Sequence, residues 1–215
     1  MENTTNNIVI SIGRQFGCKG RVVGKLTAEH FGFKFYDAEL INLAAKEIGF
    51  SPEFFEKSDE KPRMPEFFQN VGQLFLGTTD NASSDNYLSS GKMFEIQSEA
   101  IKHVAEKSNC VIMGRCSDYV LRNNPNLLSF YLSAPMDFRI KCVMERDGLS
   151  QEDAQKKIEK TDKKRATYYN YYTDKEWGHS LSYDLCVDVS LIGVEATADY
   201  ICQFIEKKFE NSGLL

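Results

Sequence analysis

Several features that mark common protein classes are missing from this chain of 215 residues. No two of its six cysteines have Cys-x-x-Cys spacing, and none of its three histidines lies within a few residues of a cysteine. The sequence therefore predicts no zinc site and no other resident metal site. No apolar run approaches the roughly 20 residues that a membrane-spanning helix needs. The N-terminus, Met-Glu-Asn-Thr-Thr-Asn-Asn, also lacks the basic and apolar regions of a signal peptide. We expect a cytoplasmic protein without membrane contact, whose cysteines are reduced and buried.

An excess of positive charge is absent too. The chain has 26 lysines and arginines against 31 acids, which gives a net charge of -5. This balance argues against a protein that coats a nucleic acid polymer, because such binding needs surplus cations. A small phosphorylated ligand needs only a few local cations and stays compatible with it. With 42% hydrophobic residues the chain can build a sizeable core, and its length fits one domain with an insertion.

Five short apolar runs predict buried strands. They span residues 8–12, 33–36, 110–113, 127–132 and 185–189. Apolar residues at helical spacing between these runs predict helices, the clearest over 93–106 and 194–209. Residues 77–91 are expected to form a mobile surface segment. Buried strands that alternate with helices predict an α/β fold with a parallel sheet covered on both faces. Ligands of such folds bind at the carboxyl ends of the strands.

A glycine-rich segment lies between the first predicted strand and the first predicted helix. It reads Gly13-Arg-Gln-Phe-Gly-Cys-Lys-Gly-Arg21. Glycine lets backbone N–H groups turn inward around an anion, and a helix N-terminus adds partial positive charge. The segment nearly matches the Gly-x4-Gly-Lys-Ser/Thr pattern of a phosphate-binding P-loop, but Lys19 precedes Gly20 and no hydroxyl residue follows. We expect the segment to bind phosphate. The candidate binding residues are Arg14, Gly17, Cys18, Lys19, Gly20 and Arg21.

The glycine segment leaves two alternatives open. A tight strand-to-helix turn with solvated basic residues would use the same glycines. The missing hydroxyl normally holds Mg²⁺ in a P-loop, so Mg²⁺ here would be held mainly by phosphates and water. Cys18 is expected to be a small filler of the loop rather than a nucleophile.

Five segments, in the same order along the chain, resemble the cytidylate kinase-like proteins, a divergent branch of the P-loop nucleoside monophosphate kinases. They are Ser11-Ile-Gly-Arg-Gln-Phe-Gly-Cys-Lys-Gly-Arg21, Phe35-Tyr-Asp-Ala-Glu-Leu-Ile41, Val111-Ile-Met-Gly-Arg-Cys-Ser-Asp118, Thr161-Asp-Lys-Lys-Arg-Ala-Thr-Tyr-Tyr-Asn-Tyr-Tyr172 and Tyr183-Asp-Leu-Cys-Val-Asp-Val-Ser190. The resemblance implies a three-layer α/β fold of the P-loop NTPase type, with core segments 8–36, 108–147 and 183–210. It also implies an NMP-binding insertion at about 37–107 and a lid at about 148–180.

The resemblance further implies roles for individual residues. Catalytic roles fall to Lys19, Arg21, Arg165 and Arg146. Arg165 stands in the lid pattern Asp-x-x-Arg, whose arginine reaches the transferring phosphate, and Arg146 near the lid entry is a second candidate for that task. Substrate-binding roles fall to Tyr36, Asp37, Arg115 and Asp118. The last two resemble the Gly-Arg-Asp region that contacts a pyrimidine nucleotide, with the aspartate displaced by two residues.

Each of these roles has a structural alternative. Asp37 also suits the N-cap of the helix that follows it. The basic run at 156–165 also suits a solvated helix face, because Glu159 and Asp162 interrupt it. The tyrosines at 168–172 are expected to pack in the core or at a contact between subunits, so a homo-oligomer is compatible with the sequence.

The leading hypothesis is an ATP-dependent kinase that transfers the γ-phosphate to a nucleoside monophosphate, with CMP or dCMP first. Phosphoryl transfer needs aligned reactants and cations around the transferred group more than covalent help, and the planar fork of arginine grips phosphate in a bidentate way. A non-catalytic nucleotide-binding module is the second hypothesis, because the loop departs from the P-loop pattern. A kinase that acts on another small acceptor is the third.

Overall fold

A computed structural model describes residues 6–47, 49 and 85–215 of the chain. The contacts divide the chain into two compact units, Met1–Ala38 with Ile101–Leu215, and Glu39–Ala100. We call the first the sheet unit and the second the helical unit. The predicted NMP-binding insertion and lid stay predictions, because contact clustering alone assigns no role to either segment.

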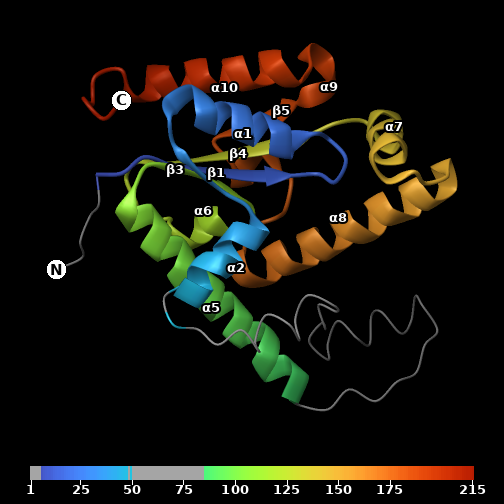
Figure 1. Ribbon diagram of the computed structural model, residues 1–215, viewed down its shortest axis with the longest axis horizontal. Coiled ribbons are helices and arrows are strands. Elements are labelled where there is room, and N and C mark those ends of the chain that lie inside the picture. Colours follow the sequence, from blue (N-terminus) through green and yellow to red (C-terminus); the bar gives the residue numbers. More distant parts are fainter. Residues whose placement is uncertain (1–5, 48, 50–84) are drawn as a thin grey trace. The chain divides into compact units, whose positions relative to one another are not determined.

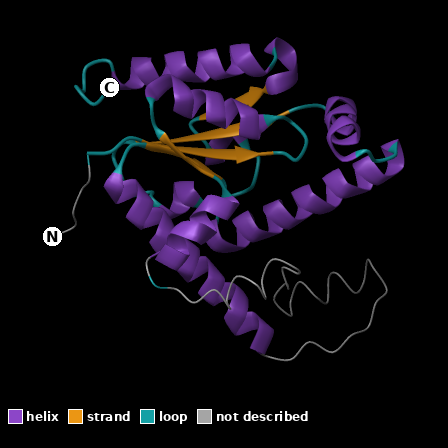
Figure 2. Ribbon diagram, in the orientation of Figure 1, coloured by secondary structure: helices purple, strands orange, loops and turns teal. Residues whose placement is uncertain are grey.

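The sheet unit is built on five parallel strands in the order β2-β3-β1-β4-β5. Their bounds are β1 (Val9–Arg14), β2 (Lys34–Tyr36), β3 (Cys110–Met113), β4 (Leu127–Ser133) and β5 (Leu185–Asp188). Each predicted strand overlaps an observed one, so the predicted α/β fold with a five-stranded parallel sheet is confirmed. The strands are continuous apolar runs because both faces of the sheet are covered by helices, as Figure 2 shows.

Helices cover the sheet in two layers. Those of the sheet unit are α1 (Gly20–Phe31), α6 (Ser117–Val120), α7 (Met136–Asp147), α8 (Gln151–Thr173), α9 (Val189–Ile192) and α10 (Val194–Phe209), with a 3-10 turn, η1 (Ser180–Ser182). Figure 1 shows α1 and α10 on one face of the sheet, and α6 and α8 on the other side. No helix among the described residues is both long and apolar enough to cross a membrane.

The two faces of the sheet differ in chemistry. Side chains alternate along a strand, and Ile10 and Ile12 of β1 join the main hydrophobic cluster together with Val23 of α1 and Ile201 of α10. Ser11 between them belongs to the opposite face, where its buried hydroxyl lies 2.7 Å from that of Ser117 in α6. Polar groups therefore collect on the face that α6 and α8 cover.

The helical unit contains part of α2 (Ala38–Glu47) and the first sixteen residues of α5 (Asp85–Lys107). Within this unit the amide of Gln97 donates a hydrogen bond of 3.0 Å to the side-chain oxygen of Asn42. The prediction of a helix over 93–106 with a surface segment before it was wrong for residues 85–91, which are helical. Asp85 suits the positive end of a helix, and the stretch after it has no proline. Residues 77–84 lie outside the described residues.

Two helical glycines provide a matched test of packing. A Cβ on Gly24 of α1 would lie 2.6 Å from Sδ of Met113, which is buried, whereas a Cβ on Gly91 of α5 would meet no atom of the described residues within 4 Å. We expect Gly24→Ala to lower the free energy of unfolding by about 1–3 kcal/mol through overpacking. Gly91→Ala should leave it unchanged or raise it by up to about 1 kcal/mol through helix propensity. Urea unfolding measures both, and equal effects would contradict the described packing.

Candidate functional site

The glycine segment is tied to the end of β4. The N–H of Gln15 donates to the carbonyl of Leu132 at 3.0 Å, and the side-chain oxygen of Gln15 accepts from the N–H of Ala134 at 3.0 Å. Gly17 has a φ of +85°, and a Cβ there would lie 3.0 Å from the carbonyl oxygen of Arg139. Glycine at position 17 thus meets both a conformational and a steric demand. Cys18 turns its side chain into the core, and burial raises the pKa of its thiol.

The turn between β1 and α1 presents unpaired donors. Among the described residues, no acceptor contacts the N–H groups of Gly17, Cys18 and Lys19. Helix α1 begins at Gly20, and its first turn carries no acidic residue. Free N–H groups beside the positive end of a helix dipole form an anion-binding site. The structure is therefore compatible with the predicted phosphate binding, which stays a prediction.

Arg14, Arg115 and Arg165 come together beside this turn, and we call them the arginine cluster. Nη1 of Arg165 donates to the carbonyl of Arg14 at 2.9 Å. Nη1 of Arg14 lies 3.8 Å from the place of a Cβ on Gly114, the neighbour of Arg115. Burial, reinforced by the charge of Arg165, lowers the pKa of Arg14 to about 10. Burial also lowers the pKa of Arg165, and the charge of Arg115 adds to this effect.

The charge of the arginine cluster is not neutralised by ion pairs. In the part of the chain that the structure describes, no carboxylate forms an ion pair with any of the three guanidinium groups. Burying like charges without partners is unfavourable, and a bound anion would relieve this cost. Residues with such perturbed pKa values are concentrated at functional sites.

An unusual turn after β3 sets the position of Arg115. Gly114, Arg115 and Cys116 have φ values of +72°, +59° and +55°. Two successive left-handed residues that are not glycine are unfavourable, and such strain is found mainly where a site demands it. The turn leads into α6 and keeps Arg115 at the carboxyl end of β3, beside β1.

Helix α8 packs one face against the rest of the sheet unit. Ala154, Ile158, Tyr169 and Thr173 are its buried residues, and Asp162 and Arg165 lie on the same face between them. The lysines of the predicted basic run instead lie mainly on the exposed faces. The run is thus mostly a solvated helix face. In the described structure, Arg165 is the basic residue of this run that contacts Arg14.

Asp162 connects α8 to the glycine segment. Oδ1 of Asp162 accepts from the N–H of Phe16 at 2.7 Å, and Oδ2 accepts from Nη1 of Arg139 at 2.5 Å. The Arg139 side chain is 7% exposed and that of Asp162 is 15% exposed, so this ion pair is largely buried. Sequence reasoning missed Arg139. The only available signal was its place beside Ile140 and Val143 on the buried face of a predicted helix.

Asp118 is buried and supports the far end of α8. Its Oδ2 accepts from the hydroxyl of Tyr169 at 2.7 Å and lies 3.5 Å from Nζ of Lys175. The hydroxyl of Tyr183, which stacks on Tyr169, is buried without a partner among the described residues. The predicted contact of Asp118 with a nucleotide is untested, and the described contacts give the carboxylate a structural role.

The remaining predicted residues have different surroundings. Arg21 donates from Nε to Oδ2 of Asp37 at 2.9 Å and makes a second contact to it through Nη2, so a predicted loop residue meets a predicted substrate residue. Tyr36 ends β2 next to them. Arg146 forms a bidentate pair with Asp147, at 2.7 and 2.9 Å, and its guanidinium stands 4.8 Å from the centre of the Phe16 ring.

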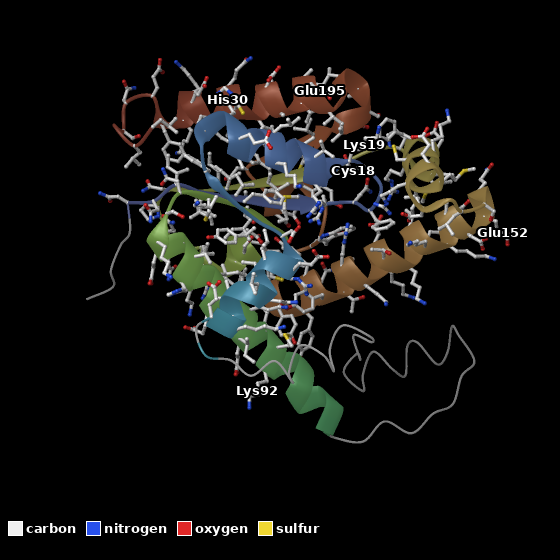
Figure 3. The ribbon with its side chains drawn as sticks, in the orientation of Figure 1. Cys18, Lys19, His30, Lys92, Glu152 and Glu195 are labelled. Atoms are coloured by element: carbon white, nitrogen blue, oxygen red, sulfur yellow. The ribbon has the colours of Figure 1, made fainter. Side chains whose placement is uncertain are left out.

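Lys19 stands at the start of α1. It is exposed and caps α1 in a left-handed conformation, with a φ of 60°. Figure 3 shows Lys19 between α1 and α7. Its charge there offsets part of the rise in pKa that burial causes at Cys142 of α7. Across the described ranges, no group of three or more His, Cys, Asp or Glu side chains could hold a metal ion.

The Arg139–Asp162 pair predicts a strongly coupled response to mutation. Asp162→Leu should lower the free energy of unfolding by about 3–5 kcal/mol, because it leaves Arg139 buried without a counter-charge. Arg139→Met in the same chain should recover most of that loss. As a control, Lys156→Met removes an exposed pair with Glu152 and should cost less than about 1 kcal/mol. Additive losses in the double variant, measured by urea unfolding, would contradict the coupling.

Comparison with known proteins assigns the chain to a family. The sequence pattern of the cytidylate kinase-like family matches residues 9–191. A cytidylate kinase of Pyrococcus horikoshii is 31% identical over 169 residues, which cover 78% of this chain and 72% of that protein. A cytidylate kinase of Pyrococcus abyssi is 29% identical over 205 residues, with 94% and 96% covered.

Solved structures share the fold of this chain. The crystal structure of an uncharacterized protein from Eubacterium ventriosum has a TM-score of 0.70 and 29% identity, covering 93% of this chain and 99% of that one. Shikimate kinase from Bacteroides thetaiotaomicron, at 14% identity, shares the fold with a TM-score of 0.52 over 93% of this chain and 98% of that one. Family and fold together support a kinase-like phosphotransferase. The chain belongs to the cytidylate kinase-like family.

Proposed function

We propose that this protein transfers the γ-phosphate of ATP to a nucleoside monophosphate, with CMP or dCMP the preferred acceptor. The observation that carries the proposal is the convergence of Arg14, Arg115 and Arg165, without ion-pair partners among the described residues, beside the free N–H groups of the glycine segment. A polyphosphate is the ligand whose charge and geometry match fixed N–H groups and several arginine forks.

The donor phosphates would lie against the turn from Gly17 to Arg21. There the N–H groups and the start of α1 would hold the β- and γ-phosphates. An oxygen of the acceptor phosphate would form a bond to the γ-phosphorus while the bond to the β,γ-bridging oxygen breaks, so ADP leaves with the electron pair. Arg165 would stabilise the charge on the transferred group, because Arg14 and Phe16 hold its guanidinium at the turn.

The acceptor would lie on the β3 side of the site. Arg115, held at the carboxyl end of β3, would grip the acceptor phosphate. Tyr36 ends β2, the neighbouring strand, and Asp37 follows it; both would contact the nucleotide from there. A pyrimidine acceptor is proposed because the relatives at 29% and 31% identity are named cytidylate kinases.

The residues at the turn offer Mg²⁺ little direct ligation. Arg21 stands where a P-loop has a hydroxyl, and its own partner is Asp37. Mg²⁺ would therefore be held mainly through phosphate oxygens and water, and it would neutralise phosphate charge there.

A non-catalytic nucleotide-binding protein is the second candidate function. It is favoured by the same departures, namely the absent hydroxyl and the pairing of Arg21 with Asp37. Such a protein would bind ATP and gain thermal stability from it without producing ADP.

Turnover assays separate these functions. The protein is incubated with MgATP and each of CMP, dCMP, UMP, AMP and GMP, and ADP and nucleoside diphosphate are measured together. We expect equal amounts of both products, with CMP or dCMP fastest. Arg165→Met should lower kcat about 100-fold or more, because it removes a charge that acts on the transferred group.

Lys160→Met is the matched control, because Lys160 is an exposed cation of the same helix. It should leave kcat within about twofold of the wild-type value. Stabilisation by ATP with no diphosphate from any acceptor would favour the non-catalytic function. Neither stabilisation nor turnover with any nucleotide would refute both.

A further inference from the structure

The first residue of α1, Gly20, is closely packed on three sides. The P-loop pattern puts lysine directly after its second glycine, at the start of the helix. Here Gly20 is the first residue of α1. A Cβ on Gly20 would lie 3.2 Å from Cβ of Arg14, 3.2 Å from Sγ of Cys18 and 3.2 Å from Cδ1 of Leu132. The Arg14 side chain therefore leaves the strand through the space beside the helix start.

Neither of the other basic residues at the turn replaces that lysine. Lys19 is exposed on the α7 side, where its charge acts on Cys142. Arg21 is half exposed and donates through two nitrogens to the buried carboxylate of Asp37. Lys19 is thus exposed to solvent, and Arg21 is already bound to an acid.

Arg14 has the surroundings of a ligand-binding cation. Its backbone is fixed on both sides, because it is the last paired residue of β1 opposite Leu132 and its carbonyl accepts from Arg165. Its guanidinium reaches Gly114 at the carboxyl end of β3. Within the described ranges its side chain donates no hydrogen bond to any acceptor. The Arg14 charge is desolvated and lies beside a second arginine. A bound anion would offset both the desolvation and the repulsion between the two charges.

We propose that Arg14, rather than Lys19, is the cation that grips the β- and γ-phosphates at the turn. This inference rests on the proposed function in that the ligand is a nucleoside triphosphate. It assigns to a strand residue the contact that a P-loop makes from the start of its helix.

Binding and turnover measured on the same variants test the assignment. Kd for ATP and ADP is measured by calorimetry for the full chain and for Arg14→Gln, Arg14→Lys, Lys19→Gln and Lys25→Gln. Arg14→Gln should weaken ATP binding about 10- to 100-fold, because a charge-assisted contact is lost. Arg14→Lys should recover part of this loss. Lys19→Gln should weaken binding by a smaller factor, and Lys25→Gln, an exposed cation farther along α1, should not change it.

Thermal unfolding without nucleotide separates binding from folding. Removing an unpaired, desolvated charge should leave the Tm of Arg14→Gln equal to or above that of the wild type, while the rise in Tm with ATP is lost. A Tm loss without nucleotide, with ATP binding intact, would overturn the proposal.

The outcomes also separate this inference from the proposed function. If the wild type binds ATP but phosphorylates no monophosphate, the proposed function fails, and a selective loss of ATP binding in Arg14→Gln still supports the role of Arg14. If Lys19→Gln loses as much ATP affinity as Arg14→Gln or more, Lys19 fills the role and the inference is overturned. Absence of ATP and ADP binding by the wild type overturns it as well.

Discussion

The carboxylate of Asp162 is the contact on which the arrangement of the site depends. It holds the N–H of Phe16 in the glycine segment and the guanidinium of Arg139 in α7 at the same time. This fixes the rotation of α8 about its axis. Arg165 follows about one helical turn later and meets the carbonyl of Arg14, and Tyr169 follows about one turn after that and meets Asp118. One buried ion pair therefore aligns three inward contacts of a 23-residue helix.

The arginine cluster shows the opposite use of charge. Asp162 and Arg139 neutralise one another. Arg14 and Arg165 instead lie close together, and burial lowers the pKa of each guanidinium. A fold selected only for stability would pair or expose these guanidinium groups. The left-handed backbone of Arg115 and Cys116 on the neighbouring turn adds a further unfavourable contribution to the stability of the fold. These unfavourable contributions lie at the carboxyl ends of β1 and β3, where α/β sheets bind their ligands, so the proposed polyphosphate would offset them.

The sheet could be predicted from the sequence, but the contacts of the site could not. Strands buried on both faces leave continuous apolar runs, so their positions follow from local pattern alone. The Arg139–Asp162 pair joins residues 23 positions apart, and Phe16 meets Asp162 across 146 positions. No local pattern reports such pairings. The burial of the Asp118 carboxylate likewise becomes evident only when Tyr169 and Lys175 surround it.

The glycine segment is closely packed where α1 begins. The Cβ of Arg14 lies 3.2 Å from where a Cβ at position 20 would be, so a side chain there would require Arg14 to shift by a few tenths of an ångström. An arginine on a strand paired through its backbone to β4 is held more rigidly than a lysine on a long flexible stem, and its planar fork loses less freedom when it binds phosphate. Glycine at position 20 therefore suits the close approach of Arg14 to the start of α1. With Arg14 as the proposed phosphate-binding cation, the altered order of lysine and glycine moves that positive charge from the helix to the strand.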